Sequence, residues 1–224
     1  MLSGIGAEGQ QKLLDSSVLI VGCGALGSVA SLYLAGSGIG RIGLVDFDTV
    51  DVSNLQRQLS FTTADVSTKK SVTLGDKLRA INPDIHVEIY DEFLTPRRAK
   101  ELIAQYDVIV EGSDNPDTKY MVSDACVALG KPYVMGGISG YGGQVTSYSP
   151  GHAAYRDIFP EAAAPDGFTP CALGGVLGPL PGIVGSIQAS EVIKIVTGIG
   201  EPLFNRLLLV DAESMQFRRI GVGE

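Results

Sequence analysis

The feature that most constrains this chain is the alternation of strand patterns with helix patterns over its first 135 residues. The run SVLIV at 17–21 is short, apolar and β-branched, which is typical of a strand buried on both faces. Further strand patterns lie at 41–46, 86–90, 107–111 and 132–135, and helix patterns lie between them at 25–36, 69–81, 96–105 and 117–129. Such alternation predicts a parallel, doubly wound sheet with right-handed crossovers.

The second half of the chain has a different pattern. Residues 143–148 alternate like a strand, a helix pattern covers 183–197, and strand patterns at 206–211 and 215–220 predict a hairpin. The stretch 150–181 is rich in Pro, Ala and Gly with little periodicity, so we expect a long loop there. Together the halves predict an α/β fold, a Rossmann-like doubly wound mixed sheet of about eight strands, parallel in its first half and antiparallel in its second.

Composition restricts the class of protein. Hydrophobic residues make up 45% of the chain, enough for a core, and the net charge of −8 argues against nucleic acid as a partner. The apolar runs are too short to span a membrane, and the N-terminus lacks a signal-peptide pattern. Cys23, Cys126 and Cys171 follow no repeated spacing, which argues against a disulfide framework and favours a cytoplasmic location.

The segment Gly22-Cys-Gly-Ala-Leu-Gly27 matches GxGxxG between a predicted strand and a predicted helix. In this pattern Gly22, Gly24 and Gly27 allow a tight turn, a close approach of phosphate and the packing of helix on strand. The helix N-terminus then offers free amides to an anion. Asp46 ends the next predicted strand, where an acid can accept hydrogen bonds from ribose hydroxyls. The segment predicts a nucleotide site and leaves open which nucleotide binds.

Polar and charged side chains gather at the predicted carboxyl ends of the strands, most densely in VDFDTVDVSNLQRQ at 45–58. The set comprises Asp46, Asp48, Asn54, Arg57, Gln58, Lys70 and Asp114. Because the carboxyl ends of parallel strands meet at one edge, we expect these side chains to converge. A nicotinamide cofactor needs no such cations, whereas triphosphate cleavage needs Mg²⁺ on carboxylates and Arg or Lys against the developing charge. The cluster therefore favours triphosphate chemistry.

From about Ile5 to about Arg218 the chain resembles the ThiF/MoeB/HesA family, the bacterial relatives of ubiquitin-activating enzymes. The resemblance rests on GIGAEGQQKLLDSSVLIVGCGALGS, DFDTVDVSNLQRQ, EGSDN, KPYVMGGISGYGGQV and GVLGPLPGIVGSIQASEVIK. It implies an adenylyltransferase that activates the C-terminal glycine of a small ubiquitin-like sulfur carrier, ThiS- or MoaD-like, in thiamine or molybdopterin biosynthesis. We accordingly expect one domain over 1–224, with a nucleotide-binding half at 1–135 and a carrier-binding half at 136–224 that includes the loop 150–181.

The resemblance also implies a role for each residue of the cluster. It places the ATP phosphates over Gly22, Gly24 and Gly27 and the ribose on Asp46. It sets Asp48, Asn54, Arg57, Gln58 and Lys70 around the phosphates, with Asp114 as the Mg²⁺ ligand and Asn115 nearby. The implied catalytic residues are Arg57, Lys70 and Asp114. The implied partners are a carrier ending in Gly-Gly, a second copy of the chain in a homodimer, and a cysteine desulfurase or rhodanese as sulfur donor.

Three features depart from the family pattern or extend it. The segment at 154–157 reads Ala-Tyr-Arg-Asp where many members have the first of two zinc-binding Cys-x-x-Cys pairs, so no structural zinc is expected. Cys171 aligns with a cysteine that forms a covalent link during sulfur transfer in some members. Family members usually carry RYxRQ before GIG, with an arginine that reaches the neighbouring subunit's ATP. Met1 falls inside this segment, so either the start is misassigned or the chain lacks this cation, in which case slow adenylation is expected.

Other interpretations stay open at this point. The same adenylation suits a carrier for another sulfur metabolite or a peptide C-terminus. The chain can also be a non-catalytic carrier-binding module, although the presence of Arg57, Lys70 and Asp114 argues against that role. An NAD-dependent oxidoreductase is allowed by GxGxxG, but the cation cluster and the absence of a suitable proton-transferring histidine argue against it.

Overall fold

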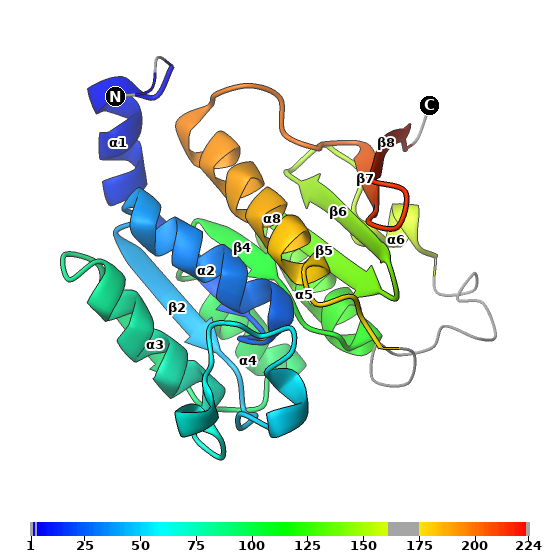
Figure 1. Cartoon of the computed structure of the whole chain (residues 1–224). Helices are drawn as coiled ribbons and strands as arrows, with labels where there is room; N and C mark the ends of the chain where they lie inside the picture. The colour runs from blue at the N-terminus through cyan, green and yellow to red at the C-terminus, as the bar shows by residue number, and fades with distance from the viewer. Residues whose placement is uncertain (1, 3, 161–174, 223–224) are drawn as a thin grey trace.

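A computed structural model describes residues 2, 4–160 and 175–222. Within this part of the chain, eight strands form one sheet in the order β3-β2-β1-β4-β5-β6-β7-β8 (Figure 1). The strands are β1 (Ser17–Val21), β2 (Arg41–Val45), β3 (His86–Tyr90), β4 (Val108–Glu111), β5 (Tyr133–Ser139), β6 (Gly142–Tyr148), β7 (Arg206–Asp211) and β8 (Gln216–Gly221). The first five pair in parallel and the last three pair antiparallel. The predicted mixed sheet is confirmed.

Helices cover both faces of the sheet. They are α1 (Gly6–Leu14), α2 (Ala25–Ser37), α3 (Lys70–Ile81), α4 (Pro96–Ile103), α5 (Pro116–Leu129), α6 (Tyr155–Ile158) and α8 (Leu180–Thr197). The apolar sides of α2, α3 and α8 pack on one face, and those of α4 and α5 pack on the other (Figure 1). No helix among the described residues is both long enough and apolar enough to cross a membrane.

Local sequence signals set the helix that follows β4. Asn115 caps α5 because its side chain accepts a hydrogen bond from the Asp117 amide at 2.8 Å, and Pro116 occupies the first turn, where no amide partner is needed. Gly130 ends the helix in the left-handed conformation, at a φ of 63°. These signals fix where α5 begins and ends, and the loop that joins β4 to α5 carries Asp114.

The expectation of an unstructured loop over 150–181 is wrong in part. Its first section contains α6, and α8 begins at Leu180, earlier than the predicted residue 183. The short helix forms because Tyr155 is buried, stacks edge-on with Tyr120 at 5.2 Å, and donates its backbone N–H to the Tyr133 hydroxyl at 2.7 Å. Asp157 accepts a hydrogen bond from the Ala154 amide at 2.8 Å and closes the first turn. A single turn is too short to show periodicity in a sequence.

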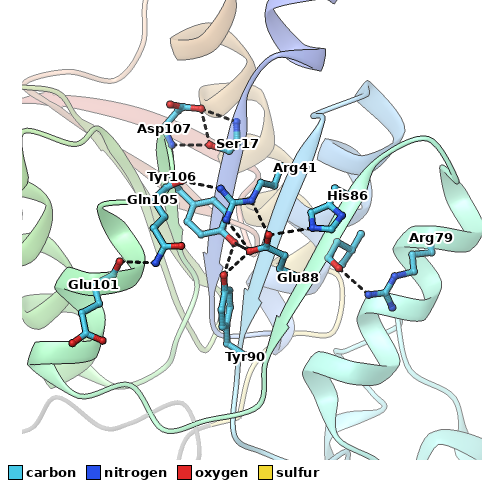
Figure 2. Close-up of polar contacts among 11 residues, drawn as sticks. Ser17, Arg41, Arg79, His86, Glu88, Tyr90, Glu101, Gln105, Tyr106 and Asp107 are labelled. Carbon is cyan, nitrogen blue, oxygen red and sulfur yellow. Dashed lines mark hydrogen bonds and ion pairs between the residues drawn. The ribbon is translucent and has the colours of Figure 1, made fainter.

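The edge strand β3 is fixed to β2 by a polar network around Glu88 (Figure 2). The carboxylate accepts two hydrogen bonds from Arg41, at 3.0 and 2.8 Å, and one each from the hydroxyls of Tyr90 at 2.6 Å and Tyr106 at 2.8 Å. Tyr106 lies across Gly43, where an added Cβ would come within 2.3 Å of its hydroxyl oxygen. The network therefore requires a glycine in the middle of β2.

Candidate functional site

A cavity of about 900 Å³ opens at the carboxyl ends of the parallel strands. One side is formed by the loops that follow β1, β2 and β4, and the opposite side is formed by β5, β6, β7 and β8. Ligands in open α/β sheets bind in this position. The predicted site residues that line the cavity are Gly22, Gly24, Asp46, Asp48, Arg57, Gln58, Lys70, Asp114 and Asn115.

The glycine loop has the geometry that its sequence predicts. Gly22 leaves β1 with a φ of 88°, a conformation that disfavours other residues. A Cβ on Gly27 would lie 1.8 Å from the carbonyl oxygen of Gly22, so this residue sits beneath the loop and allows α2 to pack against it. Gly24 caps α2 without a side-chain hydrogen bond. Gly24, Ala25 and Leu26 line the cavity, so the start of α2 lies at its wall, and the free amides of a helix start attract anions.

Asp46 joins the ends of β1 and β2. One carboxylate oxygen accepts from the Cys23 amide at 2.6 Å, and the other accepts from the Asp48 amide at 2.8 Å. Burial raises the pKa of Asp46, and these two amides oppose that shift. Cys23 is fully buried behind the loop and burial raises the pKa of its thiol well above the ordinary range, so it is a packing residue.

The two predicted cations reach the cavity from different segments. Lys70 begins α3, is 6% exposed, and donates to the Asp48 carboxylate at 3.0 Å. Arg57 follows the 3-10 turn Val52–Asn54 and donates to the Ser53 carbonyl at 3.0 Å. Asn54 does not line the cavity; its side-chain oxygen instead accepts from the Asp51 amide at 3.4 Å and closes that turn.

Asp114 lies exposed in the β4–α5 loop, at the cavity edge. Its neighbours are anchored: Ser113 hydrogen-bonds to Glu111, and Asn115 caps α5. No hydrogen bond or ion pair joins the Asp114 carboxylate to another described residue. The loop therefore holds Asp114 in place while its carboxylate stays available to a ligand.

Sequence reasoning missed a buried ion pair in the cavity floor. Lys119 lines the cavity at 7% exposure and pairs with Glu111, which is 0% exposed. A signal for it existed, because Lys119 shares the buried face of α5 with Val122, Ser123 and Cys126, at helical spacing. A lysine on such a face needs a buried partner.

Two further features of the sequence are Cys171 and the glycines near the end of β5 and the start of β6. Cys171 falls within 161–174, outside the described residues. Among the glycines of β5 and β6, Gly137, Gly142 and Gly143 line the cavity. Gly136 has another role, because a Cβ there would lie 2.6 Å from the side-chain amide of Gln188.

Known proteins have similar sequences and a similar fold. The sequence profile of the ThiF family matches residues 1–224. The chain is 45% identical over 223 residues to the probable adenylyltransferase/sulfurtransferase MoeZ of Mycobacterium tuberculosis, covering 97% of this chain and 57% of MoeZ. It is 43% identical over 228 residues to the sulfur carrier protein adenylyltransferase of Thermus thermophilus, covering 99% of this chain and 84% of that protein.

A solved structure has the same fold as this chain. The crystal structure of E. coli MccB with ATP superposes with a TM-score of 0.85 at 26% identity, over 97% of this chain and 66% of MccB. The chain thus spans little more than half of MoeZ and about two thirds of MccB. The profile match over the full sequence and the identity to these relatives establish that this chain belongs to the ThiF family.

Proposed function

We propose that this protein uses ATP to adenylate the C-terminal glycine carboxylate of a small ubiquitin-like sulfur carrier, ThiS- or MoaD-like, in thiamine or molybdopterin biosynthesis. The observation that carries the proposal is one cavity lined by the glycine loop, by Arg57, Lys70 and Asp114, and by glycines of β5 and β6. The names of the MoeZ and Thermus relatives support the same reaction class and the same kind of partner.

The cavity residues fit a nucleoside triphosphate. The glycine loop is closely packed: a Cβ on Gly22 would lie 3.0 Å from the Ser113 amide nitrogen, and a Cβ on Gly24 would lie 3.4 Å from the side-chain nitrogen of Gln58 in the cavity wall. Gln58 is 5% exposed in the cavity wall, and its side-chain oxygen has no hydrogen-bond partner among the described residues. A buried acceptor without a donor costs free energy, so a ligand hydroxyl placed there is favoured. Asp46 adds a second acceptor for ribose hydroxyls.

The proposed reaction depends on positioning the carrier carboxylate next to the α-phosphorus and on stabilising the negative charge of the phosphate oxygens. A carboxylate oxygen of the carrier attacks the α-phosphorus, and the bond from that phosphorus to the bridging oxygen of the β-phosphate breaks. Pyrophosphate leaves with the bonding electrons, and the carrier retains AMP as a mixed anhydride. No general base is needed because the nucleophile is ionised at neutral pH. Arg57 and Lys70 stabilise the negative charge on the phosphate oxygens.

Asp114 would hold Mg²⁺, with Asn115 nearby, and Mg²⁺ supplies countercharge to the triphosphate. The free, exposed carboxylate of Asp114 fits this role. Among the described residues no three His, Cys, Asp or Glu side chains converge on one point. This arrangement fits Mg²⁺, which commonly takes one or two carboxylates and completes its shell with water and substrate phosphates.

We place the carrier's Gly-Gly tail along Gly137, Gly142 and Gly143, the glycines of β5 and β6 that line the cavity. A homodimer is part of the proposal. It is supported by Val52 and Leu59, which are 67% and 78% exposed on the segment that carries Arg57. Sedimentation velocity of the protein and of Leu59→Asp tests it, with a dimer expected for the first and a monomer for the second. The proposed sulfur donor is a cysteine desulfurase or a rhodanese.

The test is ATP–pyrophosphate exchange in the presence of the carrier. We expect exchange only when the carrier keeps its terminal glycines, and a fall of at least about 100-fold in Arg57→Ala. Arg97→Ala is the matched control, because Arg97 is 89% exposed and pairs only weakly with Glu101 at 3.6 Å. Calorimetric titration should detect ATP binding and no NAD binding. Tight NAD binding without ATP binding would favour an oxidoreductase, and ATP-independent carrier binding alone would favour a non-catalytic module.

A further inference from the structure

Lys119 connects two walls of the cavity. It lies in the second turn of α5, and its ammonium donates both to the Glu111 carboxylate at the end of β4 and, at 2.6 Å, to the carbonyl oxygen of Gly136 in β5. The lysine is 7% exposed, so water competes little for these two acceptors. One buried cation therefore joins the Glu111 side chain at the end of β4 to the backbone of β5, just beyond the last paired residues of the two strands.

Glu111 connects Lys119 to the β4–α5 loop through hydrogen bonds to Ser113. Its second carboxylate oxygen accepts from the Ser113 amide at 2.9 Å and from the Ser113 hydroxyl. Ser113 directly precedes Asp114, and Gly112, Ser113, Asp114 and Asn115 all line the cavity. Burial raises the pKa of Glu111, and Lys119 is the main group that opposes this shift. Without Lys119, burial would favour the protonated, neutral form of Glu111. The hydrogen bonds that Glu111 accepts from Ser113 would then weaken.

We propose that Lys119 is a positioning residue for the metal-binding β4–α5 loop. It acts through Glu111 and Ser113 to keep the Asp114 carboxylate at a fixed position relative to β5, where Gly137 lines the cavity. This inference rests on the proposed function, in which Asp114 binds the Mg²⁺ of MgATP. Lys119 thereby has the role of an outer-shell partner, whose loss elsewhere typically weakens metal affinity by about 10- to 100-fold.

A second buried pair supplies the control for general destabilisation. Glu191 in α8 is 2% exposed, pairs with Lys194, and accepts from the Ser147 hydroxyl at 2.8 Å and the Leu203 amide at 2.7 Å. None of these residues lines the cavity. Lys194→Met and Lys119→Met each remove a lysine from a buried glutamate, but only the second loosens the loop that carries Asp114.

The experiment measures Mn²⁺ binding to the ATP complex by electron paramagnetic resonance, together with amide hydrogen exchange over residues 112–115. We expect Lys119→Met to weaken Mn²⁺ binding about 10-fold or more and to speed exchange in the loop, with ATP affinity in the absence of metal nearly unchanged. Lys194→Met should lower the melting temperature and leave Mn²⁺ affinity as in the wild type. Lys119→Arg should recover most of the affinity, because a cation again reaches both acceptors.

Two further comparisons keep the outcome decisive. If Lys119→Met is too unstable to purify, the double variant Glu111→Gln/Lys119→Met leaves no unpaired buried charge and should show the same weak Mn²⁺ binding. Wild-type Mn²⁺ affinity and loop exchange in either variant would overturn the positioning role while leaving the proposed adenylation intact. A wild-type protein that binds no ATP would instead refute the proposed function itself.

Discussion

Replacing Glu88 by glutamine tests how the edge strand β3 is held. The Glu88 carboxylate receives hydrogen bonds from Arg41, Tyr90 and Tyr106, and these residues come from β2, β3 and the segment after α4 (Figure 2). Glutamine has nearly the same shape, but it carries no charge and brings an N–H₂ group among donors. Arg41, with a side chain 30% exposed, would lose its ion-pair partner. The variant should therefore fold and be less stable.

The magnitude follows from the pKa of Glu88, which Arg41 above all, with the two tyrosine hydroxyls, lowers from its ordinary 4.5 to about 2. A tenfold change in proton affinity is worth about 1.4 kcal/mol, so the upper limit is about 3 kcal/mol. Because the side chain is 29% exposed, screening by solvent reduces the expected loss to about 1–2 kcal/mol. A lowered folded pKa stabilises the protein above pH 4.5, and this contribution disappears as the pH falls from 4.5 towards 2.

The assay is urea unfolding followed by circular dichroism, since the chain has no tryptophan. The free-energy difference between wild type and Glu88→Gln should be largest near neutral pH and should shrink as the pH falls below about 4. Glu201→Gln is the control: Glu201 is 78% exposed and 3.0 Å from Arg206, so its loss should cost under about 0.5 kcal/mol. A difference that stays the same at low pH would show that packing, and not ionisation, explains the effect.

Other predictions concern the cavity and the segment at 154–157. Gly27→Ala should abolish ATP binding in calorimetry, because the added Cβ would lie 1.8 Å from the Gly22 carbonyl oxygen. The control Gly36→Ala should bind ATP normally, because no atom lies within 4 Å of its added Cβ. Normal ATP binding by both variants would contradict the proposed phosphate site at the glycine loop. Asp114→Ala should lose Mg²⁺-dependent ATP–pyrophosphate exchange at an unchanged melting temperature, and retained exchange would remove Asp114 from the site. The melting temperature should not fall in excess chelator and elemental analysis should find little zinc, because Ala154 and Asp157 occupy the positions at which the family resemblance implies zinc-binding cysteines. Stoichiometric zinc would contradict this prediction.

Much of the fold was predictable because its signals are local. The apolar run at 17–21, the glycine loop and the helix that follows it form one continuous pattern, and β1 and α2 begin at the predicted residues. Asp46 and Asp48 follow directly from β2, so the parallel sheet alone brings them to the cavity. Their position needs no knowledge of distant contacts.

The unpredicted parts depend on contacts between residues far apart in the sequence. Helical spacing in the sequence indicates that Lys119 is buried and needs a partner, but only the folded chain shows that Gly136 of β5 lies beside it. Arg218 lines the cavity only because the antiparallel hairpin of β7 and β8 completes the sheet next to β6. Periodicity identifies such strands but does not specify which side chains reach a site on the other half of the sheet.

The central claim is that a carboxylate attacks the α-phosphorus of ATP, and isotope transfer measures this directly. The carrier is prepared with ¹⁸O in its C-terminal carboxylate, incubated with the protein and MgATP, and trapped with hydroxylamine, which attacks the acyl carbon and releases AMP. Phosphorus NMR of the products should show one ¹⁸O in AMP and none in pyrophosphate, because the attacking oxygen stays on the α-phosphorus. Release of ADP with ¹⁸O in inorganic phosphate, or AMP without label, would contradict adenylation of the carrier carboxylate.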